Sequence, residues 1–250
     1  MINFSQIFNS KNNLVIIGGD SFYENILILQ NLISIRSSFN QINFYLNDDL
    51  FPVFSLLDCN FIQQNFDLRK IDNESIIINF SKKIHQKIHK KMNSHLYMST
   101  FGGNFEIQKS EGNLLDNLIF FLKIKKDSNE KIKINILENQ SLGKFPVIVY
   151  LKKIIISPFF NKNMINIQKN IGKQVLFSVN LLLKNSSEEI HVSRKNYRDL
   201  FVAALSSDLF ISDDLDFLKF LKTFGLKVQS TIKNEEFTYC NLNELAKPIL

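Results

Sequence analysis

Tryptophan is absent from this sequence of 250 residues, and cysteine occurs only twice. Cys59 and Cys240 stand far apart and outside any C-x-x-C or Cys/His ligand spacing, so they predict neither a zinc site nor a redox pair. For each we expect an isolated, buried thiol. The sequence also shows no internal repeat and no low-complexity tract of useful length, so a repeat architecture is not expected.

Long apolar runs are missing as well. The longest uncharged runs, such as SIIINF and NLIFF, are far shorter than the roughly 20 residues that a membrane-spanning helix needs. The first residues, MINFSQIF, lack the basic region and the long apolar core of a secretory signal. We therefore expect no transmembrane helix and no export, and the predicted location is the cytoplasm.

Acidic residues are in the minority, because 24 Asp and Glu face 30 Lys and Arg, which gives a net charge of +6 and a pI near 9.1. This balance suits an anionic membrane surface, a nucleotide or a nucleic acid as partner. The chain is also rich in Ile, Asn, Lys and Phe, as AT-rich coding produces, so part of the basicity reflects mutational bias. The hydrophobic content of 45% is that of a globular protein with one large domain or two small ones.

The stretch NLVIIGGDSFYENILILQNL, residues 13–32, has the pattern of a strand, a tight turn and a helix. A short apolar run that ends at glycine predicts a buried strand. The spacing of Phe22, Ile26, Leu29 and Ile33 predicts the apolar face of a helix. Asp20 stands where this helix begins.

The acid at this position has two interpretations. Either Asp20 or Ser21 caps the helix, since Asp and Ser are preferred at helix N-termini, or the loop binds a ligand. The pair Gly18 and Gly19 would admit a phosphate at the helix N-terminus, but the G-x-G-x-x-G pattern and the lysine of a P-loop are both absent. The residues themselves leave both interpretations open.

Strand patterns alternate with helical patterns along most of the chain. The strand patterns are QINFYL, ESIIINF and LYMS in the first half, and KKIIISPFF, KQVLFSVNLLL and DLFIS in the second. This alternation predicts βαβ units around parallel sheets, and so an α/β fold. The polar, turn-rich stretch at residues 127–145 predicts a boundary between two domains, residues 1–145 and residues 146–250.

An acidic turn, formed by Asp213, Asp214 and Asp216, lies between a predicted strand and a predicted helix. Helix capping explains one or two of these acids. Alternatively the group binds a metal ion, as in a nuclease, or places one carboxylate against a ligand. The spacing does not decide between these alternatives.

His85 and His89 are four residues apart in a predicted helix, a spacing at which two imidazoles can bind one metal ion. Cations oppose a divalent metal, and the neighbouring residues supply five lysines but no carboxylate as third ligand. We therefore expect a solvated basic face without a metal, which also suits anionic lipid headgroups. The lysines of this basic segment, residues 82–91, are Lys82, Lys83, Lys87, Lys90 and Lys91.

Two stretches together resemble the ADP-heptose:lipopolysaccharide heptosyltransferase-like glycosyltransferases, the family 9 enzymes. The opening VIIGGDSFYENILILQNLISIRSSFNQINFYL looks like the strand, GD loop, helix and strand with which that family begins. The late DLFVAALSSDLFISDDLDFLKFLKTFGLKV is similar, without a gap, to the family pattern el-aali--adlfi-nDsG-lHlAaalG-p. Asp214 falls on the family aspartate and Gly225 on the later glycine. Asp216 stands where the family has glycine, and Lys219 where it has histidine.

Most of the chain takes part in the resemblance. NLLDNLIFFLKI and IIISPFF occupy the places of the family's interdomain helix and of the opening strand of its second domain. No K-W-P phosphate-contact motif follows IIISPFF, and the second domain looks trimmed between Pro158 and His191. The fold implied is GT-B-like, with two Rossmann-like domains that face a cleft.

The resemblance implies a transferase that moves a sugar from a nucleotide-sugar donor to a lipopolysaccharide-type, cell-surface glycan or glycolipid acceptor. Asp20 matches the aspartate of the GD loop, which in that family is the general base on the acceptor hydroxyl. The family chemistry needs neither a metal nor another cofactor. The protein would work at the inner membrane face, with peripheral contact through the basic segment. The implied substrate- and nucleotide-binding residues are Gly18, Gly19, Ser21, Asp214, Asp216 and Lys219.

Two other functions are compatible with the sequence. A GT-B-like protein that has lost catalysis would serve as a binding or assembly partner. A metal-dependent nuclease of the PIN or flap type would gather acids around Mg²⁺. The ungapped late match favours the transferase, and nucleic acid is not the expected partner. The acids of the nuclease alternative are Asp20, Asp199, Asp213, Asp214 and Asp216.

Overall fold

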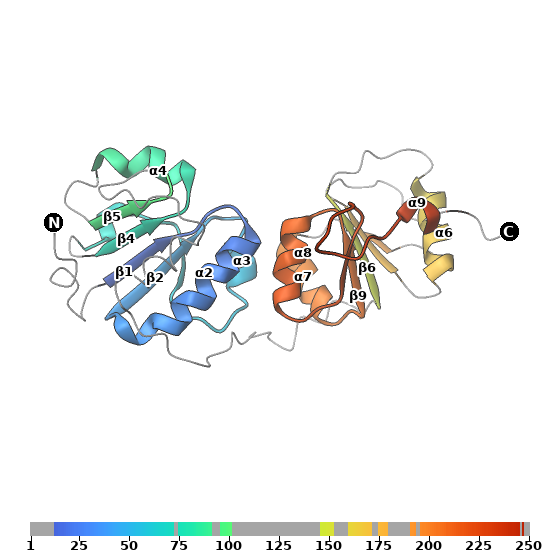
Figure 1. The fold of residues 1–250 in the computed structure, drawn as a ribbon, viewed down its shortest axis with the longest axis horizontal. Coiled ribbons are helices and arrows are strands. Elements are labelled where there is room, and N and C mark those ends of the chain that lie inside the picture. Colours follow the sequence, from blue (N-terminus) through green and yellow to red (C-terminus); the bar gives the residue numbers. More distant parts are fainter. Residues whose placement is uncertain are drawn as a thin grey trace. The chain divides into compact units, whose positions relative to one another are not determined.

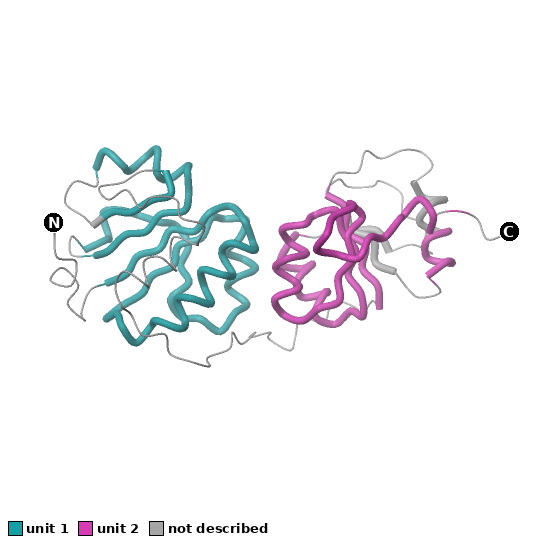
Figure 2. The backbone as a smooth tube through the Cα atoms, viewed as in Figure 1, with its two compact units in different colours: residues 1–135 teal, residues 136–250 magenta. Residues whose placement is uncertain are grey.

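The computed structural model describes residues 13–72, 75–91, 96–101, 146–152, 160–171, 175–179, 191–193, 196–245 and 247. The chain divides into two compact units, residues 1–135 and residues 136–250 (Figure 2). The predicted boundary after residue 145 lies at the edge of a segment outside the described residues, and it stays a prediction. The predicted interdomain helix at residues 113–124 lies outside them too.

Unit 1 is built on a parallel sheet in the order β3-β2-β1-β4-β5 (Figure 1). Its strands are β1 (Asn13–Ile17), β2 (Gln41–Leu46), β3 (Ile62–Gln64), β4 (Ile76–Asn79) and β5 (Leu96–Ser99). Its α-helices are α2 (Phe22–Ile35), α3 (Phe51–Phe54) and α4 (Lys82–Ile88), and its 3₁₀ helices are η1 (Arg36–Ser38), η2 (Leu68–Lys70) and η3 (His89–Lys91).

Both faces of this sheet are apolar, as is usual where helices cover a parallel sheet on both sides. Val15 and Ile17 of β1 pack in one cluster with Ile84 and Ile88 of α4. Side chains alternate along a strand, so Leu14 and Ile16, both fully buried, point to the other face. The 14-residue helix α2 lies on that side (Figure 1).

Unit 2 has a second parallel sheet, in the order β10-β9-β6-β7-β8. Its strands are β6 (Val147–Leu151), β7 (Val175–Val179), β8 (His191–Ser193), β9 (Leu209–Ser212) and β10 (Val228–Ser230). Its helices are α6 (Phe160–Ile171), α7 (Tyr197–Leu205), α8 (Leu215–Thr223) and α9 (Leu242–Leu245). Figure 1 shows α7 and α8 on one side of the sheet and α6 and α9 on the other.

The two sides of this sheet have different cores. On the α6 side, aliphatic residues of β6 and β9 pack around Ile167 and Cys240. On the α7 and α8 side the core is aromatic: the rings of Phe201 and Phe220 lie 5.1 Å apart, and those of Phe210 and Phe217 lie 5.8 Å apart. All four phenylalanines are fully buried.

The two sheets have the same topology. In each, the first strand of the unit is central, the next two strands follow on one side, and the last two on the other. The order in which strands are added to the sheet therefore reverses between β1 and β4 in unit 1, and between β6 and β9 in unit 2. Open α/β sheets bind ligands in the crevice at the carboxyl ends of the strands at such a switch point.

The predicted α/β class and the Rossmann-like sheets are confirmed, whereas the predicted cleft between the two domains stays a prediction. β3 was not predicted, because its three residues have too little pattern. The first described strand of unit 2 is β6, and the predicted strand in IIISPFF stays a prediction, because its first six residues lie outside the described residues. Cys240 is buried as expected, but Cys59 is partly exposed. Among the described helices, none has the length and apolarity needed to cross a bilayer.

Candidate functional site

Asp20 lies in the loop after β1, at the switch point of unit 1. The N-cap of α2 is Ser21, whose Oγ accepts a hydrogen bond from the backbone N–H of Glu24 at 3.1 Å. The exposed carboxylate of Asp20 instead accepts from Nδ2 of Asn47 at 3.0 Å. Of the two residues proposed as a cap, Ser21 therefore takes that role and leaves Asp20 at the carboxyl edge of the sheet.

The two glycines before Asp20 allow α2 to pack tightly on this loop. A Cβ atom at Gly18 would lie 2.2 Å from Oδ1 of Asn25 and 2.7 Å from Cδ2 of Leu46. A Cβ atom at Gly19 would lie 2.8 Å from Oε2 of Glu24. Close packing thus explains both glycines, and the Glu24 carboxylate beside Gly19 opposes a phosphate at this helix N-terminus.

Asn25 fixes the backbone of the same loop from the first turn of α2. Its side chain is fully buried, and Nδ2 donates to the carbonyl oxygens of Gly19 at 3.1 Å and of Ser21 at 2.6 Å. The carbonyl groups on both sides of Asp20 are therefore held by one amide. Oδ1 of Asn25 has no hydrogen-bond partner among the described residues, and it lies against the Cα of Gly18.

Asp214 has the corresponding place at the switch point of unit 2, directly after β9. It is the N-cap of α8, because Oδ1 accepts from the backbone N–H of Phe217 at 3.2 Å. Its Oδ2 accepts from Nζ of Lys152 at 3.0 Å and from the hydroxyl of Tyr197 at 2.5 Å. Only 5% of the Asp214 side chain is exposed, against 46% of the Lys152 side chain. This buried carboxylate thus holds a cation at the surface of the switch point.

Two further contacts fix the Asp214 group. Oδ1 of Asp213 accepts from the backbone N–H of Lys152 at 2.6 Å, which ties the end of β6 to the acidic turn. The backbone N–H of Asp214 donates to Oγ of Ser212 at 3.0 Å. Burial, and after it the hydrogen bond to Asp214, raises the pKa of Tyr197 above its ordinary value of 10.0. Tyr197 therefore keeps its hydrogen and acts as a donor.

Asp216 and Lys219 lie on α8. Asp216 is in the first turn, where a carboxylate interacts favourably with the helix dipole. Nζ of Lys219 lies 2.7 Å from Oε2 and 2.9 Å from Oε1 of Glu236, in the segment after β10. The ammonium group of Lys219 is therefore paired within unit 2.

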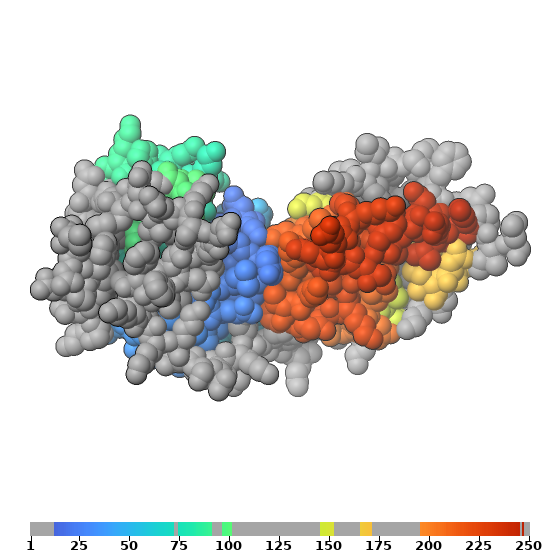
Figure 3. Space-filling model, in the orientation of Figure 1, coloured from blue at the N-terminus to red at the C-terminus, as the bar shows by residue number. Residues whose placement is uncertain are grey.

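His85 and His89 stack with ring centroids 5.0 Å apart, but each already uses its Nδ1 atom. Nδ1 of His85 lies 2.8 Å from the hydroxyl of Tyr97, and Nδ1 of His89 lies 3.0 Å from the carbonyl oxygen of His85. All five lysines of the basic segment are exposed, and α4 lies at the surface of unit 1, drawn green in Figure 3. The solvated basic face is confirmed for these residues.

No metal cluster forms from the described side chains. Nowhere among them do three or more His, Cys, Asp or Glu residues gather as ligands. Of the acids in the nuclease alternative, Asp20 belongs to unit 1 and the others to unit 2. Asp213 and Asp214 accept hydrogen bonds from Lys152. The described residues give the nuclease hypothesis no support.

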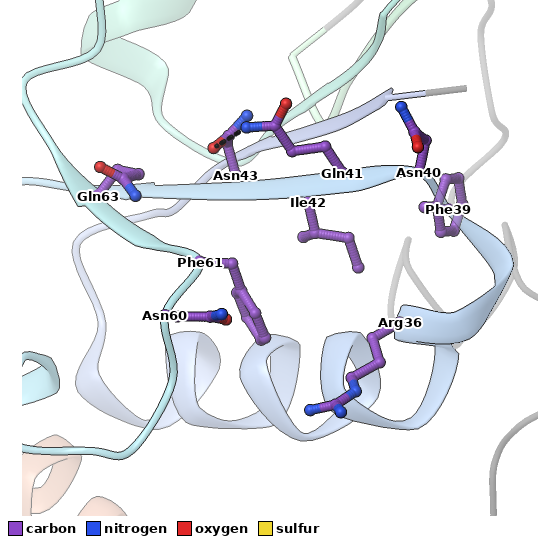
Figure 4. A pocket seen from close by; sticks show the side chains of 9 residues that line it. All are labelled: Arg36, Phe39, Asn40, Gln41, Ile42, Asn43, Asn60, Phe61 and Gln63. Carbon is purple, nitrogen blue, oxygen red and sulfur yellow. Dashed lines mark hydrogen bonds between the residues drawn. The ribbon is translucent and has the colours of Figure 1, made fainter. Parts of the chain in front are cut away.

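A pocket of about 380 Å³ lies at the opposite edge of the unit 1 sheet, at the amino ends of β2 and β3. Figure 4 shows Ile42 and Phe61 pointing to the α2 side of β2, and Gln41 and Asn43 pointing to the other side. The pocket is far from the carboxyl edge at which parallel sheets bind ligands, so it does not belong to the candidate site.

Four residues of the two switch points were missed by sequence reasoning: Asn25, Asn47, Lys152 and Tyr197. Asn25 lies on the buried face of α2, where an isolated polar residue in an apolar stripe is a signal of a buried hydrogen bond. Asn47 and Lys152 each follow a strand directly, which places them at the carboxyl edge. Tyr197 gives no such signal, because its partner lies 17 positions further along the chain.

The sequence matches no family model and no curated protein. The structure is similar to solved structures of glycosyltransferases. A glycosyl transferase family 9 protein from Veillonella parvula aligns with a TM-score of 0.59 and 13% identity over 90% of this chain and 82% of that one. The E. coli heptosyltransferase WaaC with ADP-2-deoxy-2-fluoro heptose aligns with a TM-score of 0.54 and 8% identity over 91% and 92%. WaaC with ADP aligns with a TM-score of 0.52 and 10% identity over 91% and 90%. The chain therefore has the fold of the family 9 and heptosyltransferase structures, as its sequence predicted.

Proposed function

We propose that the protein is a glycosyltransferase that moves a sugar from a nucleotide-sugar donor to a cell-surface glycan of the lipopolysaccharide type. One observation carries the proposal: in each unit, a charged side chain lies at the carboxyl edge of the sheet, around the switch point. Asp20 lies there in unit 1, and Lys152 lies there on Asp214 in unit 2. The fold shared with WaaC, which has been solved with ADP and with an ADP-heptose analogue, supports the same class of donor.

Asp20 is the proposed general base. Its carboxylate takes the proton of an acceptor hydroxyl while that oxygen forms a bond to the anomeric carbon of the donor sugar. The bond from the anomeric carbon to the diphosphate breaks, and the electron pair leaves with the nucleoside diphosphate. Gly18, Gly19 and Ser21 shape the loop that carries the carboxylate at the carboxyl edge of the unit 1 sheet.

Unit 2 holds the donor in this proposal. Lys152 meets the departing diphosphate as a point charge, because Asp214 fixes its ammonium group while nearly half of its side chain is exposed. The carboxylate of Asp216, in the first turn of α8, accepts a hydrogen bond from a hydroxyl group of the sugar or the ribose, while the buried Asp214 holds Lys152 in place. Lys219 contacts the nucleotide-sugar donor after its ion pair with Glu236 breaks. This costs little free energy, because an ion pair at the surface contributes little to stability.

The basic segment supports a proposed place of work at a membrane surface. Its five exposed lysines would contact anionic lipid headgroups, each with about 1 kcal/mol. A peripheral position at the inner membrane face would bring the switch point of unit 1 to a lipid-anchored glycan. The reaction uses no resident metal or cofactor in this proposal.

Two measurements on the full chain test the proposal. Nucleoside diphosphates should raise the melting temperature, because a ligand present at 100 times its Kd stabilises the folded state by about 2.7 kcal/mol. A set of nucleotide sugars, ADP-heptose included, is then incubated with lipopolysaccharide-type acceptors. Release of the nucleoside diphosphate and the mass gain of the acceptor are measured.

Asp20→Asn is the decisive variant. It preserves the size of the side chain and an oxygen that accepts from Asn47, and it removes the base, so transfer should fall by about 10² to 10⁴. Asp48→Asn, an exposed acid one residue after Asn47, is the matched control and should keep full activity. Nucleotide binding without transfer would favour the catalytically inactive binding or assembly protein. The absence of both would overturn the proposal.

A further inference from the structure

We infer that Asn47 is the positioning residue of Asp20, an inference that rests on the proposed function of Asp20 as the base. Asn47 directly follows β2, and its Nδ2 donates to Oδ1 of Asp20 at 3.0 Å. The two residues are 27 positions apart in sequence, and the parallel pairing of β1 with β2 brings them together at one edge of the sheet.

The orientation of the Asn47 amide is determined by its other contacts. Oδ1 accepts from the backbone N–H groups of Asp49 at 3.2 Å and of Leu50 at 3.0 Å. Both partners are donors, so the amide oxygen must face them. The amide nitrogen is therefore the end that meets Asp20.

Asn47 is itself anchored to the core of unit 1. Its backbone carbonyl oxygen accepts from the N–H of Phe51 at 2.9 Å, which starts α3. Leu50, which donates to the Asn47 side chain, is 1% exposed. The position of the Asn47 amide is therefore determined by contacts with the buried Leu50 and with the start of α3.

Asp20 is restrained from two directions. Asn25 holds the carbonyl groups of Gly19 and Ser21, so the backbone at position 20 has a fixed direction. Asn47 donates to one carboxylate oxygen, which restrains the rotation of the carboxylate. Oδ2 is then the oxygen that takes the proton of the acceptor hydroxyl.

Asn47→Asp tests this arrangement with a nearly isosteric change. An aspartate at this position keeps an oxygen that accepts from Asp49 and Leu50, so the start of α3 is preserved. Its second oxygen replaces the donor with a negative charge about 3 Å from Asp20, and two neighbouring carboxylates favour binding a proton between them. Asn60→Asp, an exposed residue in the same unit at the pocket on the opposite edge, adds the same charge and is the matched control.

The first readout needs no substrate. In a ¹³C NMR titration of the full chain, the carboxyl signal of Asp20 is identified by its absence in Asp20→Asn. In Asn47→Asp the new neighbouring carboxylate should raise the titration midpoint of Asp20 above that of the wild type, whereas Asn60→Asp should leave the midpoint where it is in the wild type. Equal midpoints in both variants would overturn the inference while leaving the proposed function intact.

The second readout is transfer. In Asn47→Asp the acid limb of the pH–rate profile should move up by the same amount, because the unprotonated carboxylate is the active form. In Asn47→Ala, kcat should fall by about 10-fold to 100-fold while the KM for the donor stays unchanged, since only the base is misplaced. An unchanged kcat and pH profile would overturn the inference. A wild-type protein without transfer would overturn the proposed function, and the NMR titration separates that failure from the absence of the contact.

Discussion

The hydroxyl of Tyr197 and the buried carboxylate of Asp214 are joined by a hydrogen bond of 2.5 Å. Lys152 shares the same carboxylate oxygen at 3.0 Å, and its ammonium group lies 5.9 Å from the centre of the Tyr197 ring. The bond ties α7 to the turn between β9 and α8, and through Lys152 to the end of β6. One carboxylate thus connects three segments that meet at the switch point of unit 2.

Tyr197→Phe should lower the free energy of unfolding by about 1.5–3 kcal/mol, the contribution typical of a hydrogen bond to a charged group. The ring contacts with Phe217 and Tyr150 remain, so the loss reports the hydroxyl, which hydrogen-bonds to Asp214 and also to Tyr150. Urea unfolding of the full chain measures the change. Tyr239→Phe, at a side chain that is 41% exposed in the same unit, should change stability by less than about 0.5 kcal/mol. Equal losses in the two variants would contradict this account of the Asp214 group.

The hydrogen-bond network around Tyr97 predicts a pH dependence of stability. Asn79 donates to the Tyr97 oxygen at 2.9 Å, and Ser99 also hydrogen-bonds to that hydroxyl. The same hydroxyl lies 2.8 Å from Nδ1 of His85. Burial, and after it the charge of His89, lowers the pKa of His85 below its ordinary value of 6.5.

Because the folded state binds the His85 proton less readily than the unfolded state, stability is greatest above pH 6.5 and falls as the pH drops below that value. His85→Gln should flatten the curve of unfolding free energy between about pH 7 and pH 5. His89→Gln, a change at an exposed neighbour, should leave most of the slope. A slope in His85→Gln as steep as in the wild type would assign the pH dependence to other groups.

Gly18→Ala should destabilise the fold more than Gly19→Ala. At position 18 the new methyl group would meet the buried Asn25 amide at 2.2 Å and Leu46 at 2.7 Å, and overpacking of this kind costs about 1–3 kcal/mol. At position 19 it would meet the exposed end of Glu24, a flexible side chain that can move away. Thermal unfolding of the two variants gives the order, and the reverse order would show that the loop, not the Asn25 contact, limits the substitution.

Replacing the five lysines of the basic segment with glutamine should weaken binding to anionic vesicles. Exposed charges are screened within about 8 Å at physiological ionic strength, so binding of the wild type should also fall as salt is added. Co-sedimentation with phosphatidylglycerol vesicles, with phosphatidylcholine vesicles as reference, measures both effects. Lys227→Gln with Lys233→Gln in unit 2 is the charge control. Equal binding to neutral and anionic vesicles at low salt would contradict the electrostatic basis.

Local pattern determined most of the elements. The apolar run at residues 14–17 predicted a buried strand, and its side chains are buried on both faces of the sheet. The spacing of Phe22, Ile26 and Leu29 predicted a helix, which is α2. The strand QINFYL was predicted to the residue, because it alternates between buried and exposed positions. Patterns of this kind depend only on residues that are close together in the sequence. The three-residue strand β3 has no such pattern, and it is defined as a strand by its parallel pairing with β2.

The sequence also placed Asp20 and Asp214 at helix starts after buried strands, since both features are local. What each acid does was decided by residues that the fold brings from elsewhere. Ser21 caps α2 in place of Asp20, whose carboxylate accepts a hydrogen bond from Asn47, 27 positions away. Asp214 caps its own helix, and it also binds Lys152, 62 positions away. Parallel sheets join strands through crossovers, so the partners at a carboxyl edge are distant in sequence, and only the tertiary structure determines which donor meets which carboxylate.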